Sequence, residues 1–522
     1  MKKFMKKILS RRILFFLSLV AGIWFSFVMF KLQVLPIKFY VLMVVVLLLI
    51  ILGLYKGQKD KNDRHPIRVT LLKLLNIVLA VALVFGSLKV MEGSNFLESI
   101  TGGSEQIIEM NVAVLKSSSY DKIADLKEKV FGANTKTDPI NINTARTKIE
   151  EEIDTINMTS YTSDATLLDD LKSQTIDAMI IGSTQLEALD DIETDVTDTL
   201  KIVKKIEIKV PKVEATSAKV TKEPFNIFIS GTDKEGPIST FALSDVNMIV
   251  TINPETKQVL LTSIPRDYFV DIIGMDNVSG KDKLTHSAKG GINCTLETVE
   301  NFMGIKFNYY AKFNFTSFMN VIDELGGIEI DVPKYKVIGN DEGRFKTKKG
   351  NNGKGYVIEP GKQTMNADKA LAFVRERKSF VDGDNIRGQN QMLMVKAIIK
   401  KCCSPSIITN MTGVFESLEN SFETNMSSQD IKSLINMQID TMTPWDVQTY
   451  HLEGDPSQRT LELATVGDIT KVNPRGAFIT VPYDDSIAQA KGYIEQMMNG
   501  EIVKAEKYIH NSSASNSTSS TE

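Results

Sequence analysis

The chain has few of the side chains that build disulfide frameworks and transition-metal sites. It contains four histidines and three cysteines, Cys294, Cys402 and Cys403, in 522 residues. Three cysteines do not make a disulfide framework in a chain of this length, although one bond from Cys294 to either of the others stays open. No Cys or His stands near them at the spacing of zinc ligands. Any chemistry must therefore come from carboxylates and basic side chains.

A strong charge of one sign is also missing. The net charge is only −3, and hydrophobic residues make up 43% of the chain. This composition excludes wholesale disorder and argues against a basic protein that binds nucleic acid. With 522 residues, the chain is long enough for two or three domains.

The apolar residues are concentrated near the N-terminus. Three apolar runs cover residues 13–30, 39–54 and 69–88. Each is near the length that crosses a hydrocarbon core of roughly 30 Å, although the third run contains Lys73. A cleaved signal peptide is the competing interpretation of the first run, but no small-residue cleavage pattern follows it. We therefore predict a short tail and three transmembrane helices within residues 1–100.

The basic residues around these runs predict the orientation of the anchor. Six Lys and Arg residues precede the first run and five lie between the second and third, whereas only Lys31 and Lys38 lie between the first and second. Cytoplasmic segments carry the excess of Lys and Arg. We expect the N-terminus in the cytoplasm and everything after about residue 90 on the extracellular side of the membrane.

A small α/β domain is predicted next, at residues 104–205. Its predicted strands are 110–115, 153–161 and 178–181, and its predicted helices are 120–130 and 165–173. This alternation indicates a largely parallel sheet. The charged stretch 191–222 is interpreted as a linker to a larger domain. Because no catalytic group stands out, we interpret the small domain as an accessory spacer or docking module.

A larger α/β domain is predicted at residues 224–500, with a mixed central sheet covered by helices. The predicted strands are 225–230, 246–253, 259–264 and 328–332, and the predicted helices are 295–303, 316–325, 367–373 and 389–402. Residues 253–257, Asn-Pro-Glu-Thr-Lys, form the turn of a hairpin. Residues 511–522 are a disordered tail without the apolar content to fold.

The hairpin brings charged residues together. If its turn is centred near Glu255, the start of one strand at Asp245 and the exit of the other at Arg266 lie side by side. If the preceding strand pairs antiparallel with 246–253, Asp233 arrives at the same sheet end. Two carboxylates with water and phosphate oxygens are a common way to hold Mg²⁺. The competing interpretation is that these Asp residues cap turns and face solvent.

A second cluster follows the predicted helix 367–373. Its main members are Arg375, Arg377, Arg387 and Gln391. In an extended segment the first two arginines point the same way. Asp384 or Asn385 can cap the next helix, and Arg387 and Gln391 then lie on one face of that helix. Arginine forks and a helix N-terminus both attract phosphate. A solvated charge run is the alternative.

Both clusters resemble motifs of one family of envelope phosphotransferases, the LytR-CpsA-Psr family, over about residues 225–455. The matching stretches are Gly-Thr-Asp at 231–233, Ser-Asp-Val-Asn-Met at 244–248, Ser-Ile-Pro-Arg-Asp at 263–267, Lys-Leu-Thr-His-Ser-Ala at 283–288 with Gly-Gly at 290–291, Glu-Leu-Gly-Gly-Ile at 324–328, and the segment 375–391. Three membrane helices and an accessory domain also resemble the capsule-linked branch of the family.

The resemblance implies a role for each matching residue. Asp233 and Asp245 would hold Mg²⁺ or Mn²⁺, as catalytic residues together with Arg266 and Arg377. The pyrophosphate of the substrate would be bound by Arg266, Lys283, Arg375, Arg377, Arg387 and Gln391. Asp267 and Asp384 would orient arginines, and His286 would be a packed polar neighbour. One position departs from the family, because Leu243 stands where an Arg usually precedes the Ser-Asp pair.

The resemblance also implies a substrate with a lipid tail. A polyprenyl chain needs an apolar slot, and the candidate residues are Phe313, Phe315, Phe318, Ile322 and Leu325, for which core packing is the alternative. The implied activity is transfer of a glycopolymer, such as capsule or teichoic acid, from a polyprenyl-pyrophosphate carrier to peptidoglycan. The alternatives are a polyprenyl-pyrophosphate hydrolase and a membrane-anchored receptor or regulator of envelope polymer synthesis.

Overall fold

The computed structural model describes residues 10–59, 66–101, 105–193, 195–232, 238, 242–275, 277–348, 353–404, 413–414, 418, 422–470 and 472–509. The chain forms two compact units. The first comprises residues 1–102, 402–419 and 426–444, and the second comprises residues 103–401, 420–425 and 445–522. The predicted tail at 511–522 and the predicted metal ligand Asp233 lie outside the described residues.

The first unit contains three long apolar helices. They are α2 (Arg11–Leu32), α3 (Ile37–Gly57) and α4 (Pro66–Thr101). All three are long and apolar enough to cross a membrane. Most of their large apolar side chains are exposed, as expected for surfaces that face lipid. The three helices predicted from the apolar runs are confirmed, and they indicate a membrane anchor.

A shorter helix, α13 (Ser428–Thr441), belongs to the same unit although it lies far along the chain. Lys38, at the start of α3, forms an ion pair of 2.9 Å with Asp440 of α13. The predicted larger domain, 224–500, therefore contributes one helix to the unit of the membrane helices.

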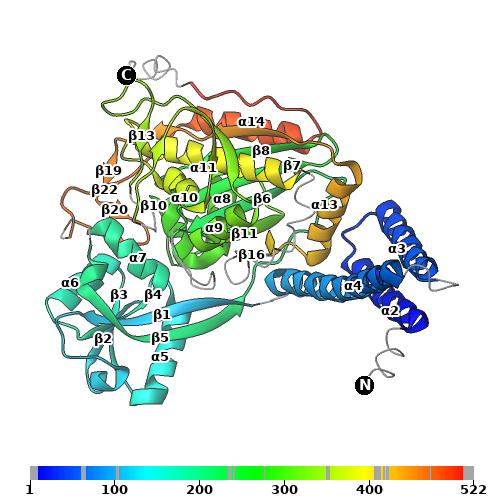
Figure 1. The fold of residues 1–522 in the computed structure, drawn as a ribbon. Helices are drawn as coiled ribbons and strands as arrows, with labels where there is room; N and C mark the ends of the chain where they lie inside the picture. The colour runs from blue at the N-terminus through cyan, green and yellow to red at the C-terminus, as the bar shows by residue number, and fades with distance from the viewer. Residues whose placement is uncertain are drawn as a thin grey trace. The chain divides into compact units, whose positions relative to one another are not determined.

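The second unit begins with a five-stranded sheet, which corresponds to the predicted accessory domain (Figure 1). Its strands, in the order β3-β2-β4-β1-β5, are β3 (Asn157–Tyr161), β2 (Val130–Asn134), β4 (Ala178–Gly182), β1 (Glu105–Leu115) and β5 (Leu200–Pro211). Its helices are α5 (Pro139–Ile153), α6 (Asp164–Lys172) and α7 (Ser183–Ile192). Strands β2, β3, β4 and β5 share one direction and β1 runs opposite to them, because β1 pairs antiparallel with both β4 and β5.

Two local predictions in this domain are wrong. Residues 120–130 contain only a short 3-10 helix, Ile123–Leu126, before β2 begins. The supposed linker contains strand β5, in which Ile206 and Ile208 are buried while Glu207 between them is exposed. The alternation of charged and apolar residues was the signature of a half-buried strand.

The rest of the second unit is built on a six-stranded mixed sheet. In spatial order its strands are β16 (Phe422–Thr424), β11 (Tyr309–Asn314), β6 (Phe225–Thr232), β7 (Val246–Asn253), β8 (Gln258–Ile264) and β17 (Asp446–His451). The predicted hairpin is confirmed, since Asn253 pairs with Gln258 beside the turn. Strands β6, β8, β11 and β17 share one direction, so their carboxyl ends lie at the same sheet edge.

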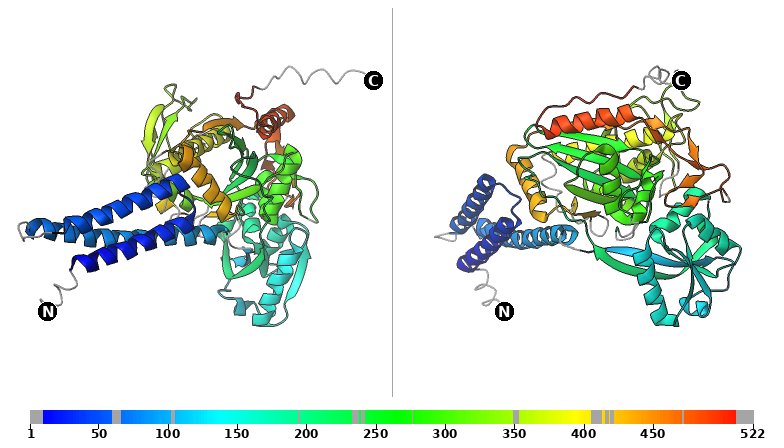
Figure 2. Two further views of the ribbon diagram at one scale, coloured as in Figure 1. Left: turned by 90° about the vertical axis from the view of Figure 1, so that its right-hand side faces the viewer. Right: turned by 180° about the vertical axis from the view of Figure 1, so that it is seen from behind.

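Helices cover both faces of this sheet, and Figure 2 shows them from two further sides. The core on one face joins Phe228, Ile249 and Leu260 to apolar side chains of α8 (Gly291–Met303) and α14 (Asp484–Met498). On the other face, Met392 of α11 (Gly383–Cys402) packs against Met248, Val250 and Leu261. The predicted α/β class, with a mixed sheet covered by helices, is confirmed.

The three cysteines do not form disulfides. Cys294 is buried in α8, and Cys402 and Cys403 are half-buried. Burial raises the pKa of its thiol to about 12, so the group stays protonated and unreactive at neutral pH.

The accessory domain packs against the larger domain of the same unit through a shared core and a buried ion pair. Leu463 and Val466 of the larger domain belong to the apolar cluster of the accessory helices. Lys289 Nζ lies 3.1 Å from Asp164 Oδ2, with both side chains almost fully buried. Asn134 Nδ2 donates to the other oxygen of Asp164 at 2.6 Å. Each charge therefore depends on its partner for solvation.

We predict that this ion pair behaves as a coupled unit. Lys289→Met or Asp164→Asn leaves one buried charge without its partner and should destabilise the protein by about 3 to 5 kcal/mol. The double variant should lose less than the sum, because no charge is left unpaired. Thermal unfolding of the detergent-solubilised protein measures these losses. Lys127→Met, at an exposed ion pair, is the control and should change little; additive losses would contradict the coupling.

Candidate functional site

The site lies at the sheet edge where the parallel strands end. Asp245 precedes β7, and its backbone N–H donates to the carbonyl of Gly231 at 2.8 Å. Gly231 has no space for a side chain, because a Cβ there would lie 2.8 Å from Phe313 Cζ and 2.9 Å from Val246 Cβ. The glycine of the Gly-Thr-Asp motif thus allows β6, β7 and β11 to approach closely.

Arg266 is held between two carboxylates at this edge. Its guanidinium forms an ion pair with Asp245 Oδ1, and its Nε lies 3.7 Å from Asp267 Oδ1. Lys283 Nζ lies 3.4 Å from the same Asp267 oxygen. The four side chains are mostly buried, between 5% and 16% exposed. Asp245, Arg266 and Lys283 are therefore brought together as the sequence predicted, with Asp267 orienting both cations.

The position of Lys283 depends on a buried network behind it. The neighbouring Asp282 accepts hydrogen bonds from Thr465 N at 2.8 Å and Thr465 Oγ1 at 2.6 Å, and its other oxygen lies 2.7 Å from His286 Nδ1. Burial alone would raise the pKa of Asp282, but His286 and Lys289 outweigh it and hold that pKa at about 2. The carboxylate is thus charged at neutral pH, and His286 is a packed neighbour without access to the site.

The second cluster is arranged differently from the prediction. Arg375 is the last residue of α10 (Ala367–Arg375), with its guanidinium 4.7 Å from the centre of the Phe315 ring. It does not share an extended segment with Arg377, so the expected two-pronged cation is wrong. The helical periodicity of 367–373 simply continues for two more residues.

Helix α11 also starts earlier than predicted. It begins at Gly383, so Asp384 and Asn385 lie within its first turn and do not cap it. Asp384 Oδ1 lies 3.3 Å from Arg387 and 3.6 Å from Arg377, which brings these arginines together at the helix N-terminus. The positive end of the helix adds to their charge.

One small cavity, of about 40 Å³, joins the two clusters. Of the predicted site residues, Asp245, Arg266, Arg387 and Gln391 line it, with Asp267 and Asp384. Lys283, Arg375 and Arg377 do not line it. The ion pair between Asp245 and Arg266 helps to fill the space, so a phosphate group can enter only if these side chains move.

Sequence reasoning missed several lining residues, above all His451 at the carboxyl end of β17. The residue is 9% exposed, and neither ring nitrogen has a hydrogen-bond partner in the described part of the chain. Burial, with a smaller effect of Lys507, lowers the pKa of His451 to about 4. A polar residue directly after a predicted parallel strand was the available signal, but strand β17 was not predicted.

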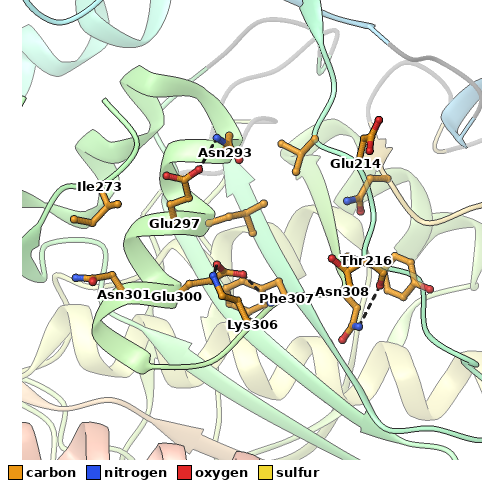
Figure 3. Close-up of a pocket in the computed structure, with 14 residues that line it drawn as sticks. Glu214, Thr216, Ile273, Asn293, Glu297, Glu300, Asn301, Lys306, Phe307 and Asn308 are labelled. Carbon is orange, nitrogen blue, oxygen red and sulfur yellow. Dashed lines mark hydrogen bonds and ion pairs between the residues drawn. The ribbon is translucent and has the colours of Figure 1, made fainter. Parts of the chain in front are cut away.

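A larger cavity, of about 460 Å³, lies at the opposite end of β11 (Figure 3). Its carboxylates are Glu214, Glu297 and Glu300, and its one cation, Lys306, pairs with Glu300 at 2.5 Å. This lining repels anions. The small cavity has arginines and a helix N-terminus, so chemistry and not size identifies the candidate site.

The described residues contain no group of three or more His, Cys, Asp or Glu side chains suited to hold a metal ion. Asp245 faces the small cavity and offers one carboxylate, while Asp233 directly follows Thr232, the last described residue of β6. A site with only a few protein oxygen ligands fits Mg²⁺, because this ion keeps water and substrate oxygens in its coordination shell. The metal site remains a prediction.

The predicted lipid-binding residues lie where β11 passes into α9 (Phe315–Glu324). Phe315, Ile322 and Leu325 are buried, and Phe313 and Phe318 are half-buried. Because Arg375 stacks on Phe315, a predicted phosphate ligand and a predicted lipid contact are neighbours.

Comparison with known proteins places this geometry in context. The LytR_cpsA_psr family model matches residues 192–471. The chain is similar to the polyisoprenyl-teichoic acid–peptidoglycan teichoic acid transferase TagU of Bacillus licheniformis, with 30% identity over 53% of this chain and 79% of that protein. Its identity to the corresponding transferase TagT of Bacillus subtilis is 35%, over 44% of this chain and 70% of that protein. A solved structure of B. subtilis TagV is 26% identical, over 54% of this chain and 99% of that chain, with a TM-score of 0.42.

The packing of His451 gives a testable prediction. A Cβ at Gly388 of α11 would lie 2.6 Å from His451 Cε1 and 3.1 Å from its Nδ1. Gly388→Ala should therefore destabilise the protein, because overpacking costs about 1 to 3 kcal/mol and exceeds the gain of about 1 kcal/mol for Ala in a helix. Gly492→Ala in α14, where nothing lies within 4 Å of the added Cβ, should be stabilising. Thermal unfolding compares them; equal stabilisation by both would refute the close packing.

Proposed function

Because the match over residues 192–471 shows that the chain belongs to the LytR-CpsA-Psr family, we propose that it transfers a glycopolymer from a polyprenyl-pyrophosphate carrier to peptidoglycan. The relatives named above are transferases of this kind. The observation that carries the proposal is the cavity in which Arg266, at a strand end, and Arg387, at a helix N-terminus, converge. Two arginine forks and a helix dipole form a site for the two phosphates of a pyrophosphate.

In the proposed reaction, a sugar hydroxyl of peptidoglycan attacks the phosphorus that carries the glycopolymer, and polyprenyl phosphate leaves. Catalysis of phosphoryl transfer is mostly positioning and charge neutralisation. Arg266 and Arg387 bind the phosphate oxygens, with Gln391 beside them and Arg377 at the rim. Lys283 holds Asp267 in place behind Arg266. The Phe315 region, next to Arg375, receives the first part of the polyprenyl chain.

We also propose that Asp245 and Asp233 hold Mg²⁺, or Mn²⁺ in its place. The bound cation would neutralise charge that develops on the phosphates. The ion pair seen in this structure supports the assignment, since the Asp245 carboxylate is mostly buried, lines the cavity and already has a cationic partner. Arg266 is released toward a phosphate only when Asp245 has another positive partner, so metal and substrate binding should be coupled.

The proposed reaction takes place at the cell membrane, and the three apolar helices of the first unit support this. The distribution of Lys and Arg around the three helices predicts a cytoplasmic N-terminus. The catalytic domain would then lie on the extracellular side, where peptidoglycan is. A capsule polymer or a teichoic acid is the glycopolymer that the family suggests.

The metal proposal predicts a non-additive loss of activity. Asp233→Asn and Asp245→Asn keep the side-chain size but remove the charge that a hard divalent cation requires. Each should abolish transfer, and the double variant should be scarcely worse than either one, because the two would act as one unit. Steady-state transfer is measured with polyprenyl-pyrophosphate donor and peptidoglycan across a Mg²⁺ titration. Full wild-type activity in excess chelator would end the metal hypothesis.

The arginine proposal predicts a graded loss of substrate binding. An ammonium group cannot reproduce a bidentate fork, and one lost charge-assisted contact is worth about 1.5 to 3 kcal/mol, or more than tenfold. Arg266→Lys should weaken donor binding more than Arg377→Lys, because Arg266 is 16% exposed and Arg377 is 49% exposed. Arg344→Lys, at an exposed ion pair with Glu359, is the control. Donor affinity of Arg266→Lys equal to that of this control would remove Arg266 from the site.

A further inference from the structure

A second cavity, of about 270 Å³, adjoins the site along α11 and β17. Its lining includes Tyr335, Gln389, Tyr450, His451, Glu453 and Lys507. His451 lines both this cavity and the small cavity with the arginines. The volume is close to the lower end for small-ligand sites, roughly 300 Å³.

Helix α11 presents a different face to each cavity. Arg387 and Gln391, four residues apart, line the small cavity, and Gln389 and Leu393, also four residues apart, line the second. Gly388 lies between these faces and leaves the space that the His451 ring fills. The imidazole ring therefore separates the small cavity, which binds anions, from the second cavity, whose lining has a different chemistry.

The second cavity has the lining of a carbohydrate site. Its tyrosine rings are fixed, because the Tyr335 hydroxyl donates to Asn390 Oδ1 at 2.7 Å and the Tyr450 hydroxyl donates to the Ser486 carbonyl at 3.1 Å. Within the described residues, the side chains of Gln389 and Lys507 have no hydrogen bond or ion pair. Rigid aromatic walls with a few unengaged polar groups fit the apolar faces and hydroxyls of a sugar.

His451 lacks the partner that a buried polar group normally has. Both ring nitrogens are buried without a hydrogen bond among the described residues. Buried polar atoms are nearly always satisfied, and an exception calls for a missing partner. A polar group of a ligand that enters from either cavity is the nearest source of a hydrogen-bond partner for the ring.

We propose that the second cavity binds a saccharide of the acceptor and that His451 receives the acceptor hydroxyl beside the donor phosphorus. This inference rests on the proposed function. The new bond forms between the hydroxyl oxygen and the phosphorus that carries the glycopolymer. The bond from that phosphorus to polyprenyl phosphate breaks, and its electron pair leaves with polyprenyl phosphate. The hydroxyl proton passes to the free ring nitrogen of His451.

The electrostatics around His451 suit this role once donor is bound. In the free protein burial keeps the ring neutral, so a nitrogen lone pair is available. The cations that line the two cavities with it are Arg266, Arg387 and Lys507, and the carboxyls are Asp245, Asp267, Asp382, Asp384 and Glu453. The negative phosphates of the donor would favour the protonated ring and strengthen it as a base.

The test separates acceptor binding from chemistry. With a polyprenyl-pyrophosphate-linked polymer as donor and soluble, uncrosslinked peptidoglycan strands as acceptor, Gln389→Ala and Lys507→Ala should each raise the acceptor KM about tenfold. They should leave the donor KM unchanged. Lys504→Ala, on the same C-terminal segment but outside the cavity lining, should match the wild type.

His451→Gln keeps a hydrogen-bonding side chain but cannot accept the proton. It should lower kcat by about 100-fold or more, with donor affinity within threefold of the wild type. Donor affinity also shows that the variant is folded. Unchanged acceptor KM in both cavity variants, or unchanged kcat in His451→Gln, would overturn this inference while wild-type transfer continues. Absence of transfer by the wild-type protein would instead refute the proposed function.

Discussion

The pairing of β7 with β8 is the constraint on which the site depends. The register runs from Asn253 opposite Gln258 at the turn to Asn247 opposite Ile264 at the far end. Asp245 and Arg266 each lie two residues beyond that last pair, so they meet as an ion pair. A slip of one residue would turn each side chain of a strand to the other face of the sheet. The short turn and the buried faces of both strands fix the register.

Local signals predicted this hairpin correctly, because its turn residues and apolar strands specify a register without distant contacts. The arrangement of the second cluster was not predictable in the same way. Arg375 ends a helix whose length is set by packing, and its stacking on Phe315 joins segments about sixty residues apart. His451 was not predicted as a site residue, because the position of β17 depends on its parallel pairing with β8, which is far away in the sequence. Pairing over such distances leaves no local pattern.

The accessory domain contacts the segment that carries Asp245. Glu187 of α7 accepts a hydrogen bond from the backbone N–H of Leu243 at 2.9 Å. The Leu243 side chain is buried, at the position where the resemblance to the family implied an arginine. The departure from the family motif thus coincides with a contact to a domain outside the catalytic fold. Together with the ion pair between Asp164 and Lys289, this contact connects the accessory domain to the segment before Asp245 and to the segment after Lys283.

The central claim is that pyrophosphate binds at the carboxyl edge of the six-stranded sheet. Experimental electron density for a complex with polyprenyl pyrophosphate tests it most directly. The account predicts both phosphates between Arg266 and Arg387, with the Asp245 ion pair opened. Phosphates bound away from both arginines, for example in the acidic cavity of Figure 3, would contradict it.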